Sequence, residues 1–116
     1  MPKYMLFLHE SPDVAKNWSP EQMQSVIERY GAWSRGLIES GRLVQGEKLR
    51  DEGGRQLRRD ASGVMVADGP YSETKEVLSG FFQVEASGYE EAAEIAKSCP
   101  HLEYGWIEVR EIEPTA

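Results

Sequence analysis

Short apolar runs alternate along the chain with polar segments rich in glycine, proline and aspartate. The runs at residues 3–9, 42–49, 64–67, 80–86 and 105–112 predict β-strands. Residues 3–9 are almost continuously apolar, which indicates a mostly buried strand. Residues 56–59 predict a short edge strand within a hairpin-like insertion, where exposed charges discourage unwanted pairing.

A long helix is predicted to begin after Ser19 and to end before Gly41. Ser19 and Gln22 have the spacing of a capping box, and Pro20 suits the first helical position. Gly41 suits a left-handed C-terminal cap. Apolar residues recur between these ends with helical spacing and predict one buried stripe, made of Met23, Val26, Ile27, Tyr30, Trp33, Leu37 and Ile38.

A second helix is predicted to open within residues 87–91 and to stop before Pro100. Its shared face consists of Tyr89, Ala92, Ala93, Ala96 and Cys99. Without the insertion, the order of elements is a doubled β-α-β arrangement, which predicts a ferredoxin-like α+β sandwich of βαββαβ order. Two helices cover only one face of such a sheet, so we expect a homodimer that covers the other face.

Length and composition indicate a single domain and argue against nucleic acid and anionic membranes as partners. With 116 residues and a net charge of −7, the chain lacks the basic surface typical of nucleic-acid and anionic-membrane binding. The apolar run at residues 4–8 is too short for a signal peptide or a membrane span, which favours the cytoplasm. The single cysteine, Cys99, cannot form an internal disulfide, and its place at a helix C-terminus favours a packed hydrophobe over a nucleophile.

The segment at residues 68–76, with the sequence DGPYSETKE, concentrates turn chemistry and charge between the apolar runs 64–66 and 81–84. Proline fixes φ and cannot donate to a ladder, so the strand should end sharply here. A charged loop flanked by core is where a site is expected. Asp68 could hold the turn by accepting local N–H groups, or it could orient a histidine or contact a ligand.

The residues carry a family likeness over nearly the whole chain. The segment at 68–76, the sequence GFF at 80–82, CPH at 99–101 and IEVR at 107–110 together resemble the YCII-related superfamily. The nearest pattern is the group named for its Asp-Gly-Pro-Phe (DGPF) motif, with Tyr71 in the aromatic place. The resemblance implies a ferredoxin-like protomer, a dimeric α/β barrel, and accessory proteins associated with extracytoplasmic-function sigma factors. In the wider superfamily a His–Asp pair is a proposed acid–base dyad with its histidine in the first helix, where this chain has none.

The candidate catalytic residues are His9, His101 and Asp68. Histidine titrates near neutrality, and either histidine could meet Asp68 in space or remain a solvated loop residue. The candidate ligand-binding residues are Glu47, Tyr71, Glu73 and Lys75. In a cleft Lys75 could neutralise an anion and Glu73 could act as a base, whereas on the surface they would form a solvated charge cluster.

No metal or other cofactor is expected. The chain has no paired-histidine, Cys-x-x-Cys or Glu-x-x-His spacing, and Gly53-Gly54 is not followed by a helix. A haem would have only His9 or His101 as its ligand. The larger aromatic residues could line an apolar pocket, although core or interface packing is the more usual use: Trp18, Trp33, Trp106, Phe81 and Phe82.

Two functions follow from this sequence. The first is a small cytoplasmic homodimer that binds a small molecule in a cleft near Asp68, with acid–base catalysis as an extension. The alternative is a non-enzymatic interaction protein in a regulatory circuit.

Overall fold

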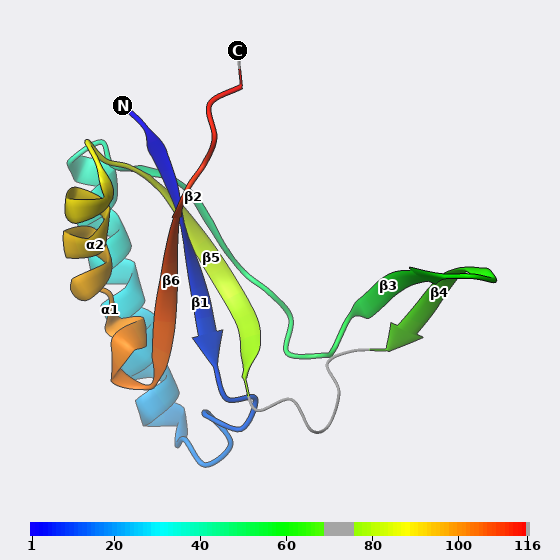
Figure 1. Cartoon of the computed structure of the whole chain (residues 1–116). Helices are drawn as coiled ribbons and strands as arrows, with labels where there is room; N and C mark the ends of the chain where they lie inside the picture. The colour runs from blue at the N-terminus through cyan, green and yellow to red at the C-terminus, as the bar shows by residue number, and fades with distance from the viewer. Residues whose placement is uncertain (69–75, 116) are drawn as a thin grey trace.

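The computed structural model describes residues 1–68 and 76–115. The elements are β1 (Lys3–Glu10), α1 (Pro20–Glu39), β2 (Leu43–Lys48), β3 (Arg55–Asp60), β4 (Gly63–Asp68), β5 (Val77–Glu85), α2 (Tyr89–Lys97), a 3₁₀ turn η1 (Pro100–Glu103) and β6 (Gly105–Glu111). Four strands form an antiparallel sheet in the order β2-β5-β1-β6. Both helices lie on one side of this sheet (Figure 1). The fold is therefore α+β and compatible with the ferredoxin-like sandwich.

The ends of α1 confirm the sequence interpretation. The Ser19 hydroxyl accepts the Gln22 N–H at 3.1 Å, and the Gln22 side chain accepts the Ser19 N–H at 2.7 Å, which completes the capping box. Gly41 follows the helix with φ of 74°, a conformation that glycine adopts without steric cost. These local signals set where α1 starts and stops.

The predicted stripe of α1 is wider than the face that packs. Val26 and Leu37 are buried, whereas Ile27 and Ile38 are 56% and 60% exposed. Successive residues of a helix are about 100° apart, so only one member of each adjacent pair can face the sheet. Met23, in the first turn of α1, is also 40% exposed.

The core lies between the sheet and the helices. Tyr4 and Leu6 of β1 and Val84 of β5 are at most 1% exposed and face the helical layer. Ala92 and Ala96 place small side chains on the facing side of α2, which lets this helix approach the sheet closely. Tyr89 is predicted on the same face but is 53% exposed, and its ring lies edge-on to Tyr4 with the two ring centroids 5.0 Å apart.

The segment at residues 64–67 corrects a prediction. It was expected to be flanking core, but it pairs only with β3 in a separate two-stranded sheet. The exposed fractions of Val64, Met65 and Val66 lie between 53% and 62%, because no helix or sheet of the described chain covers them. The hairpin projects away from the sandwich (Figure 1).

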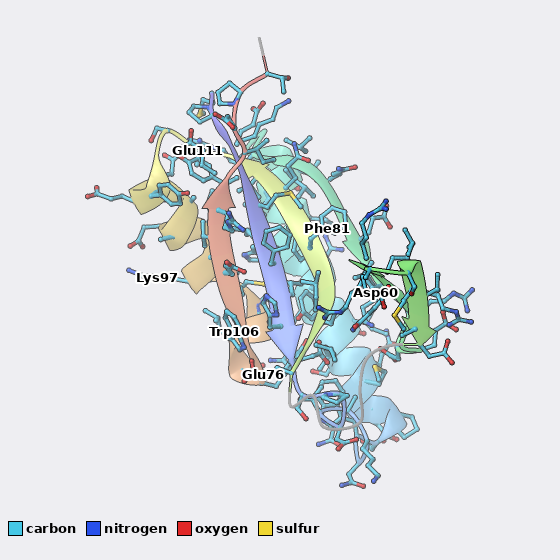
Figure 2. All side chains as sticks on the ribbon, turned by 45° about the vertical axis from the view of Figure 1, so that its right-hand side comes forward. Asp60, Glu76, Phe81, Lys97, Trp106 and Glu111 are labelled. Atoms are coloured by element: carbon cyan, nitrogen blue, oxygen red, sulfur yellow. The ribbon has the colours of Figure 1, made fainter. Side chains whose placement is uncertain are left out.

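The sheet face opposite the helices is aromatic, and no helix of the described residues packs on it. The register pairs Phe7 with Phe81 and His9 with Trp106, so these side chains share that face. Trp106 remains 44% exposed and Leu78 41%. Figure 2 labels Trp106 on β6 and Phe81 on β5. We call this surface, defined by Phe7, His9, Leu78, Phe81 and Trp106, the open face. Among the described residues, no helix is both long and apolar enough to cross a membrane.

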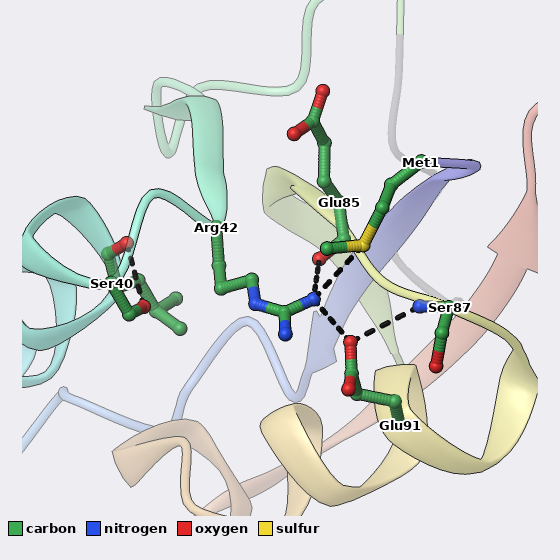
Figure 3. Close-up of polar contacts among 7 residues, drawn as sticks. Met1, Ser40, Arg42, Glu85, Ser87 and Glu91 are labelled. Atoms are coloured by element: carbon green, nitrogen blue, oxygen red, sulfur yellow. Dashed lines mark hydrogen bonds and ion pairs between the residues drawn. The ribbon is translucent and has the colours of Figure 1, made fainter.

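One polar cluster ties the start of β2 to α2. The Arg42 guanidinium pairs with Glu91 and donates to the Glu85 carbonyl and the Met1 sulfur (Figure 3). Glu91 also accepts the Ser87 N–H at 3.1 Å. Gly88 is the N-cap of α2 and has no side chain, so Glu91 ties the helix to the backbone of the residue that precedes this cap.

Candidate functional site

A cavity of about 490 Å³ lies between α1 and the end of the sheet. Its walls are mostly apolar and aromatic, with Trp18 and Val26 on one side and Phe82 on the other. Gly46 permits this arrangement, because a Cβ there would lie 2.4 Å from the Phe82 ring. Concave, largely apolar cavities with a few polar groups are the usual form of small-molecule sites.

The polar groups of the cavity form a chain of three side chains. The Tyr104 hydroxyl contacts the Tyr30 hydroxyl at 2.5 Å, and the Tyr30 hydroxyl contacts Nδ1 of His101 at 2.9 Å. Nε2 of His101 lies 2.8 Å from the carbonyl oxygen of His9. We call Tyr104, Tyr30 and His101 the relay. It connects the cavity wall with a histidine that is 1% exposed.

The carbonyl oxygen of His9 decides which atom donates each hydrogen bond of the relay. A carbonyl oxygen can only accept, so Nε2 of His101 carries a hydrogen and donates to His9. In the neutral ring Nδ1 then has a lone pair, which accepts the Tyr30 hydroxyl hydrogen. The Tyr30 oxygen accepts in turn from Tyr104. The Tyr104 oxygen is thus left with acceptor capacity at the cavity wall.

Burial keeps the relay uncharged. Desolvation lowers the pKa of His101, although the nearby Glu10 acts in the opposite direction. Desolvation also raises the pKa of Tyr30 and of Tyr104. The imidazole and both phenols are therefore neutral near pH 7.

Two local features bring His101 to this position. Pro100 starts the 3₁₀ turn η1, in which residues three apart lie on the same side, as His101 and Tyr104 do. Gly105 leaves room for the ring, because a Cβ there would lie 2.4 Å from both His101 Nε2 and the His9 oxygen. The hydrogen bond between the two histidines thus depends on a glycine.

Some of the charged side chains that line the cavity form ion pairs, and others do not. Lys48 donates to Asp51 at 2.7 Å, so these two form a pair at the mouth. Glu10 lines the cavity close to the relay and has no ion-pair partner among the described residues. The interior therefore presents a net negative field beside the acceptor oxygen of Tyr104.

The sequence-predicted site residues separate into different regions. His101 lies in the relay, and Glu47 borders the cavity, although its pairing with Phe81 directs its side chain to the open face. His9 stacks on Trp106 at 4.2 Å on the open face, with Nε2 3.6 Å from Glu108. Only the backbone of His9 contacts the relay.

Asp68 lies on the hairpin, away from both histidines. Its carboxylate is 3.3 Å from Arg55 Nε, and its side chain is 89% exposed. In the described part of the chain, neither histidine contacts Asp68. Tyr71, Glu73 and Lys75, together with the Gly69-Pro70 turn, lie outside the described residues.

Tyr30 and Tyr104 were missed as site residues. Tyr30 fits the apolar stripe of α1, which predicts a packed ring, and Tyr104 falls outside any regular pattern. The spacing His101-x-x-Tyr104 after a proline was an available signal. Nothing in the sequence could place Tyr30 beside them, because that contact spans 71 positions.

The single thiol of the chain is buried, and the metal-ligating side chains of the described residues are not clustered. No cluster of three or more metal-ligating side chains occurs within residues 1–68 and 76–115. Cys99 is 3% exposed, and burial raises the pKa of its thiol to about 11. The expectation that Cys99 packs as a small hydrophobe is confirmed.

Comparison with known proteins identifies relatives of the chain. A family model described as the YCII-related domain matches residues 2–116. An uncharacterised protein of Rhizobium meliloti (strain 1021) is 30% identical over 95 residues, which cover 81% of this chain and 77% of that protein.

Proposed function

The chain belongs to the YCII-related family, and on this premise we propose that it is a small-molecule-binding protein whose ligand occupies the cavity between α1 and the sheet. The observation that carries the proposal is the relay, because three polar side chains from α1 and the η1 region converge on one apolar cavity. Buried polar groups in an apolar setting are costly unless they are satisfied or used.

The chemistry of the cavity selects a class of ligand. Its aromatic walls favour an apolar or aromatic body, and the Tyr104 oxygen accepts a hydrogen bond from it. The carboxylate of Glu10 disfavours an anion in the same space. The preferred ligand is therefore a neutral or cationic molecule with one hydrogen-bond donor.

The same relay can carry acid–base chemistry. Tyr104 takes a proton from a donor group of the ligand and passes its own to Tyr30, and Tyr30 passes its own to Nδ1 of His101. The ligand is left deprotonated and His101 protonated. Nδ1 then donates to Tyr30, Tyr30 donates to Tyr104, and Tyr104 donates into the cavity, so the cavity end of the relay changes from acceptor to donor.

The assembly we propose is a homodimer formed through the open face, in a cytoplasmic protein of the DGPF group. Phe7, Phe81 and Trp106 form an aromatic surface that a monomer would leave in contact with water. Light scattering at micromolar concentration tests this part. A monomeric mass would contradict the dimer without bearing on the cavity.

Binding is tested with four probes that share one ring: toluene, phenol, benzylamine and benzoate. The side-chain N–H signal of Trp18 reports on the cavity by NMR, and that of Trp106, on the open face, is the control. We expect phenol and benzylamine to bind about tenfold more tightly than toluene, as one hydrogen bond of about 1.4 kcal/mol gives. Benzoate should bind most weakly.

The variant Tyr104→Phe separates the relay from the cavity. It should reduce phenol binding to the level of toluene and leave toluene unchanged. Failure of all four probes to move the Trp18 signal at millimolar concentration would contradict the proposal and favour a protein that acts through its surface.

A further inference from the structure

The β3–β4 hairpin carries apolar side chains that the described residues of its own chain leave uncovered. Leu57 is 64% exposed and Val66 62%, and the two pair across one face of the hairpin. Met65, on the other face, is 56% exposed. A two-stranded hairpin is at best marginally stable alone in water, so burial elsewhere must support this one.

The position of the hairpin points to where that burial occurs. It stands on the side of the sheet away from the helices, the same side as the open face (Figures 1 and 2). The radius of gyration is 16.3 Å, against about 13 Å expected for a compact domain of this length. A cavity of about 500 Å³ lies where the base of the hairpin meets the sheet, and it is lined by Gln56 of β3 and Leu78 of the open face.

Charge distinguishes among possible occupants of this space. The hairpin carries Arg58 and Arg59, which have no ion-pair partner among the described residues. The chain as a whole has a net charge of −7. Strand register directs Glu47 and Glu108 to the open face. A second copy of this chain thus offers a surface that is both apolar and acidic.

From these observations we infer that the β3–β4 hairpin is an exchange arm, which packs Leu57 and Val66 against a second copy of the chain. In a two-fold dimer each arm covers the partner while the partner's arm covers it. This inference rests on the proposed homodimer and adds to it. The open face supplies the centre of the interface and the arm supplies its outer part.

The test compares dissociation constants by analytical ultracentrifugation. The variant Leu57→Ser with Val66→Ser removes the apolar surface of the arm, and Arg58→Glu with Arg59→Glu reverses its charge. Each should weaken the dimer at least tenfold. Ile38→Ser is the matched control, because Ile38 is 60% exposed on α1 and should leave the constant unchanged.

Hydrogen exchange at residues 55–60 gives a second readout. The amide protection of this strand should increase with protein concentration, whereas protection in α1 should not. A dimer whose constant is unchanged in both arm variants would overturn the inference and leave the homodimer intact. A monomeric wild-type chain would instead overturn the homodimer, and the arm with it. Protection that increases only when another macromolecule is added would assign the arm to a different partner and contradict the inference.

Discussion

Buried His101 donates its Nε2 hydrogen to the main-chain carbonyl of His9 at 2.8 Å. This bond fixes the tautomer of one candidate histidine through the backbone of the other. The His9 side chain points to the opposite side of the sheet and stacks on Trp106. The two histidines therefore contribute to one site through a ring and a carbonyl, not as two imidazoles.

Tyr30→Phe should destabilise the fold more than Tyr104→Phe. Loss of the Tyr30 hydroxyl leaves Nδ1 of His101 without its donor in a buried position, at a cost of about 1–3 kcal/mol. Loss of the Tyr104 hydroxyl leaves Tyr30 still bonded to His101, so the cost should be below about 1 kcal/mol. Urea unfolding of both variants measures the difference. Equal losses would mean that the relay does not end at His101.

Gly105→Ala should reduce the free energy of unfolding by about 1–3 kcal/mol, because the new methyl group would overlap His101 and the His9 carbonyl. Gly36→Ala is the control within α1, since a Cβ at that position meets no heavy atom within 4 Å. It should stabilise the protein by about 0.5–1 kcal/mol. Thermal unfolding followed by circular dichroism compares the two. A neutral Gly105→Ala would show that the ring can move away from the carbonyl.

Stability should fall with acid because of His101. Its pKa in the folded chain is lowered by burial from the ordinary value of 6.5, so the unfolded chain binds a proton first as the pH falls. The contribution of the neutral ring is complete above pH 6.5 and is lost as the pH falls through the folded pKa. Urea midpoints between about pH 7.5 and pH 5 measure this decline. His101→Gln, which does not titrate, should flatten it, and an unchanged slope in this variant would assign the decline to other groups.

Arg42→Met should lower stability by about 1–2 kcal/mol, since it removes charged hydrogen bonds to Glu91 and to the Glu85 carbonyl at a partly buried position. Lys97→Met, which breaks the exposed pair with Glu94, should cost less than about 0.5 kcal/mol. Chemical denaturation of the two variants gives the comparison. Similar losses in both would indicate that the Arg42 cluster is no stronger than a surface ion pair.

Local signals in the sequence predicted much of the sandwich. The Ser19 capping box, Gly41 and Pro100 act within a few residues of themselves, so their meaning does not depend on the rest of the fold. The burial of residues 64–66 could not be predicted in the same way. Apolar residues in a strand indicate a surface that is buried, but they do not indicate whether the same chain or another molecule buries it.

The candidate site was predictable only in part. His101 was identified by its titration range, whereas Tyr30 was assigned to the core because a tyrosine in an apolar stripe usually packs there. Asp68 stands at a conspicuous turn in the sequence, which made it a candidate catalytic residue. In the structure its carboxylate pairs with Arg55 on the hairpin. Contacts that join residues about 70 positions apart decide the site, and no local pattern encodes them.

The irregular register of β5 beside β1 has a consequence for the shape of the cavity. Leu8 pairs with Gly80 and His9 with Leu78, so Ser79 is an extra residue in β5, and its hydroxyl donates to the Leu8 carbonyl. This one residue reverses the alternation of side chains and turns Leu78 to the open face. If Ser79 instead paired with His9 in a regular ladder, Leu78 would pair with Glu10, point toward the helices and fill space at the end of the cavity. The bulge therefore keeps Leu78 out of the cavity although β5 carries an extra residue, and deletion of Ser79 would leave Leu78 on the open face.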